Sequence, residues 1–145
     1  MQPVQADHYR VLVVEDEGVQ AFMLGRLLTE MGHEVCSIVG TESAAIAAAA
    51  RFEPTMMIID DRLGEGSGAA ALFEILRVRA IAHVLVSGDQ TRARPDQPGT
   101  VILRKPFTEL QLARAMKQAR QPGMLTQLKS RLDVQPLPLT GISKP

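Results

Sequence analysis

The chain has 145 residues, of which 46% are hydrophobic, and this length and composition fit a single globular domain with one core. Lys and Arg together number 16, as do Asp and Glu, so the chain has no excess charge to hold nucleic acid or an anionic membrane, and we expect no direct nucleic-acid binding. The single Cys36 allows no internal disulfide, and no apolar stretch approaches the ~20 residues of a membrane span or forms a signal-peptide core, so we expect a cytoplasmic chain without membrane contact.

Short runs rich in Val and Ile alternate along the chain with longer segments of helical period. Such alternation is typical of βαβ units, and it predicts an α/β fold with a parallel sheet. Pro54 precedes the third run and marks its start, because proline cannot donate a hydrogen bond to a neighbouring strand. We expect strands at residues 10–15, 33–39, 55–60, 83–88 and 100–105.

The segments between these strands carry helix signals of differing strength. Apolar residues at helical spacing predict amphipathic helices over 19–31 and around 72–76. The alanine-rich segment 42–51 has little side-chain bulk, so its helix should lie close to the sheet. The final helix has the clearest start, because Thr108 can cap it while Gln111 reaches back to the cap.

After Arg120 the prolines become frequent and interrupt any regular element. Residues 124–132 can form about two helical turns, which either dock on the domain or extend outward. The segment is too short to fold as a second domain, because chains below ~40 residues rarely stabilise themselves.

Polar side chains follow four of the predicted strands, at the rim where parallel α/β sheets usually carry their functional sites. Each group taken alone has an ordinary explanation, such as a solvated loop or a carboxylate at the start of a helix. Their occurrence together, in this order, favours a shared site. The groups are Glu15 and Asp16, Asp60 and Asp61, Ser87 with Gly88 and Asp89, and Lys105 with Pro106.

This set of motifs resembles the chemotaxis-regulator-like receiver domain of two-component response regulators. The resemblance implies a flavodoxin-like, doubly wound, five-stranded parallel sheet with strand order 2-1-3-4-5. It covers residues 9–120, so that 1–8 form an N-terminal extension and 121–145 a tail that is partly helical or disordered.

The resemblance also implies a role for each matching residue. Asp60 is the phosphoacceptor, because the family pattern places Leu or Met three residues later and Leu63 fits that place. Ser87 and Lys105 match the hydroxyl and lysine residues of the catalytic set, and the peptide bond between Lys105 and Pro106 is implied to be cis. Mg²⁺ is the implied cofactor. Its predicted ligands are Glu15, Asp16, Asp60 and the backbone carbonyl of Arg62.

The implied function is phosphorylation-dependent signalling in a phosphorelay. A histidine kinase or phosphotransfer protein donates the phosphoryl group, and the receiver signals by conformational change to a protein partner. The chain is then no conventional enzyme, although it catalyses its own phosphoryl transfer and slow autodephosphorylation. Two alternatives remain open, namely a receiver fragment of a hybrid kinase or larger regulator, and a pseudo-receiver that only binds. The sequence also leaves a homodimer open.

Several positions depart from the usual receiver pattern. Gly64 stands where a proline is common, which predicts a looser and more mobile loop. Ile102 replaces the aromatic residue that commonly takes part in the switch. We hypothesise that Arg62 and Asp89 pair and shield the acyl phosphate from water, although two solvated surface charges are an equal alternative.

The connection between the fourth and fifth predicted strands is short. Residues 89–99 include Pro95 and Pro98, so the fourth helix of the receiver pattern should be short or absent. Similar shortening is found in some alphaproteobacterial receivers linked to general stress signalling, and the chain resembles these more weakly.

Overall fold

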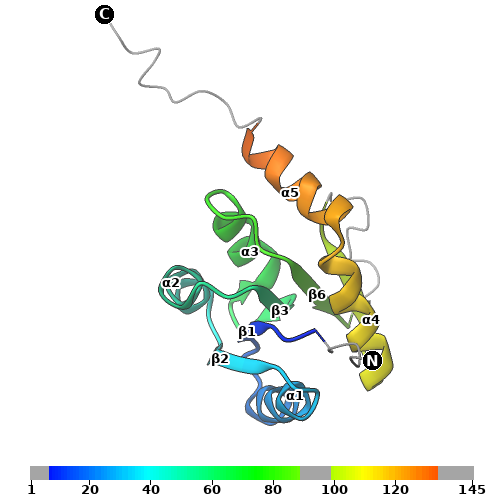
Figure 1. Cartoon of the computed structure of the whole chain (residues 1–145). Helices are drawn as coiled ribbons and strands as arrows, with labels where there is room; N and C mark the ends of the chain where they lie inside the picture. Colours follow the sequence, from blue (N-terminus) through cyan, green and yellow to red (C-terminus); the bar gives the residue numbers. More distant parts are fainter. Residues whose placement is uncertain (1–6, 89–98, 134–145) are drawn as a thin grey trace, which may run out of the picture.

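The computed structural model describes residues 7–88 and 99–133, and within them five parallel strands form one sheet (Figure 1). The strand order is β2-β1-β3-β6-β7. Because β4 and β5 form a separate hairpin, this is the predicted order 2-1-3-4-5, and the flavodoxin-like fold is confirmed. The sheet strands are β1 (Arg10–Val14), β2 (Glu34–Val39), β3 (Met56–Asp60), β6 (His83–Ser87) and β7 (Val101–Arg104).

Helices cover both faces of the sheet and divide the core into two clusters (Figure 1). On one face, α1 and α4 pack over residues such as Val13 and Ile58; on the other, α2 and α3 pack over Leu12 and Ile59. Adjacent residues of one strand thus serve opposite faces, as the pleat of a strand requires. The helices are α1 (Gly18–Glu30), α2 (Glu42–Phe52), α3 (Gly68–Leu76), α4 (Glu109–Ala119) and α5 (Pro122–Asp133).

Register in the parallel sheet brings the strand ends to one rim. Val14 lies opposite Ile59, so that Glu15 and Asp60 both follow at the same level. On the next pair, Asp60 lies opposite Val86, which precedes Ser87. The polar groups that the sequence placed at separate strand ends are therefore neighbours along one edge.

Two of the predicted helix features are present as expected. The Thr108 side chain accepts from the Gln111 N–H and the Gln111 side chain accepts from the Thr108 N–H, which is the predicted capping box. In α2 the side chains of Ala45 and Ala49 are buried, so the alanine-rich helix lies close to the sheet.

The segment after Asp61 contains secondary structure that the sequence analysis did not predict. The loop after Asp61 forms the antiparallel hairpin of β4 (Arg62–Leu63) and β5 (Gly66–Ser67), and its greater mobility stays a prediction. Gly64 in its turn has φ +50°, a left-handed conformation that favours glycine.

The tail helix α5 docks on the domain, and Leu128 is buried in the core cluster beneath α2 and α3. The expectation of a short or absent fourth helix falls on residues 89–98 and lies outside the described residues. Within the part of the chain that the structure does describe, no helix combines the length and apolar character needed to cross a bilayer.

Candidate functional site

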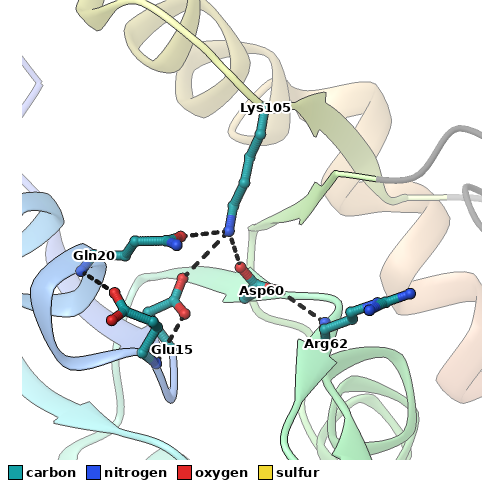
Figure 2. A network of polar contacts seen from close by, with 6 residues as sticks. Glu15, Gln20, Asp60, Arg62 and Lys105 are labelled. Carbon is teal, nitrogen blue, oxygen red and sulfur yellow. Dashed lines mark hydrogen bonds and ion pairs between the residues drawn. The ribbon is translucent and has the colours of Figure 1, made fainter.

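Asp60 ends the central strand β3, and its side chain is nearly inaccessible, with 7% of the residue exposed. One carboxylate oxygen, Oδ1, accepts from the backbone N–H of Arg62 at 2.8 Å. The other, Oδ2, lies 2.5 Å from Nζ of Lys105 (Figure 2). Both oxygens are thus oriented by donors from different elements, so the carboxylate has a fixed direction.

Lys105 follows β7 and reaches across the rim to three side chains (Figure 2). Besides Asp60, its Nζ contacts Oε1 of Gln20 at 2.6 Å and Oε1 of Glu15 at 3.7 Å. Burial lowers the pKa of this ammonium, but the hydrogen bond to Asp60 and the charges of Asp60 and Glu15 outweigh that effect, so the pKa is raised. Lys105 therefore stays protonated at neutral pH.

Glu15 is a buried carboxyl group directly after β1. Its Oε2 accepts from the Glu17 N–H at 3.1 Å, and its own N–H donates to the carbonyl of Val39 at 2.9 Å. The pKa of Glu15 is raised to about 7, chiefly by burial and next by the adjacent Asp60, while the Glu17 N–H and the Lys105 charge oppose the rise. Burial and the proximity of Asp60 thus disfavour the ionised form of Glu15.

Ser87 and the Lys105 backbone complete the rim. Ser87 ends β6, is 2% exposed, and accepts through its carbonyl from the Lys105 N–H at 2.9 Å. The peptide bond between Lys105 and Pro106 is cis, as the family resemblance implied. The predicted hydroxyl residue and the predicted lysine therefore lie on adjacent strands at the same level of the sheet.

Asp16 and Arg62 are placed differently from Glu15 and Asp60. Asp16 is exposed, and its carboxylate lies next to Gly64 in the turn of the hairpin. The Arg62 guanidinium points away from the other labelled side chains, so Arg62 meets Asp60 only through its backbone (Figure 2). Asp89, the partner that we expected for Arg62, lies outside the described residues.

The predicted metal ligands Glu15, Asp16 and Asp60 stay a prediction. Among the residues that the structure describes, no three Asp, Glu, His or Cys side chains come close enough to hold a metal ion together. The donor set nevertheless suits a hard cation, because Glu15 and Asp60 offer carboxylate oxygens. The pKa of Glu15 is raised mainly by burial and also by the adjacent Asp60, and a cation bound between the two carboxylates would oppose both effects.

Gln20 is a member of the site that the sequence analysis did not identify. It lies in the first turn of α1, where the side chain of Glu17 caps the helix by accepting from the Gln20 N–H at 2.8 Å. A glutamine in an amphipathic helix carries no distinctive signal. Only the cap at Glu17 could have indicated that the first turn of α1 faces the rim.

A groove of about 520 Å³ opens from this site toward α1. Asp60, Glu15 and Lys105 line its polar end, and Met23 and Phe107 belong to its apolar remainder. A ligand or partner that approaches Asp60 along this groove would therefore contact mainly apolar side chains before it reaches the charged groups.

Known proteins resemble the chain mainly at the level of its fold. No family model matches the chain. The receiver domain of PhyR from Erythrobacter litoralis is 24% identical, with a TM-score of 0.67, and the match covers 79% of this chain and 95% of that domain. A CheY-like receiver domain from Methylobacillus flagellatus is 21% identical, with a TM-score of 0.67, and the match covers 79% of this chain and all of that domain. The fold is that of a response regulator receiver domain.

Some of the relatives are longer than this chain. PhyR from Brucella abortus is 24% identical, with a TM-score of 0.70 over 90% of this chain, and the chain spans 54% of that protein's length. The transcriptional regulatory protein PdtaR of Mycobacterium tuberculosis is 26% identical over 140 residues, which cover 88% of this chain and 68% of PdtaR. The predicted resemblance to receiver domains is thus confirmed for the fold, and the structures of similar fold include one described as a PhyR stress response regulator.

Proposed function

We propose that this chain is a phosphorylation-dependent signalling receiver that accepts a phosphoryl group on Asp60. A histidine kinase or phosphotransfer protein donates the group, and a protein partner recognises the phosphorylated receiver. The observation that carries the proposal is the 2.5 Å contact between the Asp60 carboxylate and the Lys105 ammonium at the rim of a receiver fold. Buried acid, fixed orientation and adjacent positive charge are what phosphoryl transfer to a carboxylate requires.

In the reaction, a carboxylate oxygen of Asp60 attacks phosphorus. A new O–P bond forms, the P–N bond of a phosphohistidine donor breaks, and the bonding electron pair and a proton remain on the departing imidazole. The Arg62 N–H orients the carboxylate through Oδ1, and Lys105 offsets charge on the transferred oxygens. The hydroxyl of Ser87 supplies a further donor at the neighbouring strand end.

Mg²⁺ is part of this proposal as the cofactor. Glu15, Asp16, Asp60 and the Arg62 carbonyl would hold it, and when bound it supplies positive charge that neutralises the acids and the phosphoryl oxygens. Without such a cation the crowded carboxylates repel an incoming phosphate, so phosphorylation should require a divalent ion.

The partner class is proposed from the fold relatives. Among the PhyR structures of similar fold is an anti-anti-sigma factor from Bartonella quintana, 21% identical to this chain. The chain spans about half the length of these PhyR proteins. We propose that its output partner is a protein regulator.

Intact mass measurement after incubation with acetyl phosphate and Mg²⁺ tests the proposal directly. We expect one phosphoryl adduct on the wild type, none on Asp60→Asn, and an adduct on the neighbouring control Asp61→Asn. Omission of Mg²⁺ should abolish labelling. A wild type that takes up no phosphate, with the fold intact by circular dichroism, would contradict the proposal and favour a binding module.

A further inference from the structure

The β4–β5 hairpin lies between Asp60 and α3, and it is too small to be stable alone. It pairs Arg62 with Ser67 and Leu63 with Gly66, and at its base the Gly68 N–H donates to the Asp61 carbonyl at 2.8 Å. Short isolated two-stranded hairpins are marginal in water, so other parts of the fold must hold this one in place.

Glu42, the first residue of α2, makes that additional contact. Its Oε2 accepts from the backbone N–H of Ser67 at 2.6 Å, across 25 residues of sequence. Hydrogen bonds to a carboxylate are short and roughly twice as strong as neutral ones. Thr41 caps α2 by accepting from the Ala44 N–H, which fixes the turn that carries Glu42.

Gly66 makes the contact sterically feasible. A Cβ atom at residue 66 would lie 2.8 Å from Cδ and 2.9 Å from Cγ of Glu42, closer than side-chain atoms tolerate. A side chain at residue 66 would therefore displace the Glu42 carboxylate from its position beside the hairpin backbone.

The hairpin in turn carries the donor that orients the phosphoacceptor. Arg62, paired with Ser67 across the hairpin, donates its N–H to Oδ1 of Asp60 at 2.8 Å. Glu42 therefore connects to Asp60 through one pair of residues, from Ser67 to Arg62. Displacement of the hairpin would move both the N–H and the carbonyl of Arg62 relative to the site.

We infer that Glu42 is a positioning residue for phosphorylation: by holding Ser67 it fixes the hairpin so that the Arg62 backbone orients the Asp60 carboxylate. The inference rests on the proposed function, because its effect on rate presupposes that Asp60 is phosphorylated. A simpler role for Glu42 is to place negative charge at the start of α2, where the helix dipole favours it. The two roles depend on different properties of Glu42. Positioning of the hairpin depends on its hydrogen-bond acceptor oxygen, whereas stabilisation of the helix dipole depends on its negative charge.

Three substitutions separate these roles. Glu42→Ala removes acceptor and charge, Glu42→Gln removes the charge but keeps an acceptor oxygen, and Gly66→Ala keeps Glu42 but obstructs its approach. Glu65→Ala is the matched control, because Glu65 is an exposed acid in the turn of the same hairpin. Each full-length variant is checked by circular dichroism and thermal unfolding.

The rate of labelling by acetyl phosphate is measured over a Mg²⁺ titration. We expect Glu42→Ala to lower the rate at saturating Mg²⁺ and to raise the half-saturating Mg²⁺ concentration, each by about tenfold, as is usual when the support of a ligand is lost. Gly66→Ala should behave likewise, whereas Glu42→Gln and Glu65→Ala should stay near wild type. A Glu42→Ala protein with wild-type kinetics, or a Glu42→Gln protein as slow as Glu42→Ala, would overturn the inference.

Amide NMR of the unphosphorylated protein tests the structural connection independently of the reaction. The Arg62 and Ser67 amide resonances should both shift in Glu42→Ala. In Glu42→Gln the Ser67 resonance should shift, because its acceptor changes from a carboxylate to an amide oxygen, whereas the Arg62 resonance should stay near its wild-type position. If the wild type takes up no phosphate, the proposed function fails, and the Arg62 resonance still decides the connection. An Arg62 amide that is unmoved in Glu42→Ala refutes it.

Discussion

Single residues at the rim balance negative charge that the fold has concentrated there. The Lys105 ammonium lies within 2.5 Å of Asp60 and 3.7 Å of Glu15, and it opposes the rise in the pKa of Glu15 without preventing it. Burial is the larger influence on Glu15, since desolvation penalises the carboxylate form. The site is therefore sensitive to pH when no cation is bound.

The raised pKa of Glu15 predicts a pH-dependent stability for the metal-free protein. Between pH 4.5 and about 7 the folded state keeps a proton that the unfolded state has released, so stability should fall as pH rises through this window. At 1.36 kcal/mol per pKa unit the loss is at most about 3 kcal/mol. Urea unfolding with a chelator present, at a series of pH values, measures it.

Glu15→Gln is the control for this prediction. Glutamine does not titrate, so the part of the slope that belongs to Glu15 should vanish while other contributions remain. Equal slopes for the wild type and Glu15→Gln between pH 4.5 and 7 would contradict a raised pKa at Glu15.

At the scale of elements, α5 contributes to the core although it follows the last helix of the receiver pattern. Leu128 is 2% exposed, and Gln127 Oε1 accepts from the Gly99 N–H at 2.9 Å, just before β7. Side chains from α5 thus hold the start of an edge strand of the sheet. The helix is more than a linker, because it buries apolar surface against the domain.

Leu128→Ala should therefore destabilise the protein by about 2 to 5 kcal/mol, the usual cost of truncating a buried leucine. Leu110→Ala on α4 is the comparison, because Leu110 is 57% exposed and its loss should cost little. Chemical denaturation at one pH compares the two. Equal stability of both variants would mean that α5 does not dock in solution.

At the scale of the whole molecule, cation binding and folding should be linked. A ligand that binds only the folded state adds stability that grows with its concentration. Mg²⁺ at a hundredfold excess over its Kd should thus raise the free energy of unfolding by about 2.7 kcal/mol. The measurement is urea unfolding at neutral pH and constant ionic strength.

The matched variants for this linkage are Asp60→Asn and Asp61→Asn, which remove the same charge at adjacent positions. Asp60→Asn should lose most of the Mg²⁺ stabilisation, whereas Asp61→Asn should retain it. An equal response of the two variants would show that the cation acts through general screening rather than at the proposed site.

The residues by themselves indicated a parallel sheet, its rim and most of the groups there, whereas the strand order was implied by the resemblance to receiver domains. Strands in a parallel sheet share one direction, so acids after β1 and β3 and the Ser and Lys after β6 and β7 had to meet at one edge. The capping box of α4 was readable for a similar reason, because it depends on residues three positions apart. Local spacing and strand polarity need no knowledge of distant packing.

Only the tertiary structure decided which groups touch. Gln20 meets Lys105, and Glu42 meets Ser67, across 85 and 25 residues of sequence. The hairpin and the docking of α5 likewise depend on how helices from separate segments settle against the sheet. No local pattern encodes such contacts, because they are fixed by the packing of whole layers, in which a side chain's partner follows from shape and distance rather than from its neighbours in sequence.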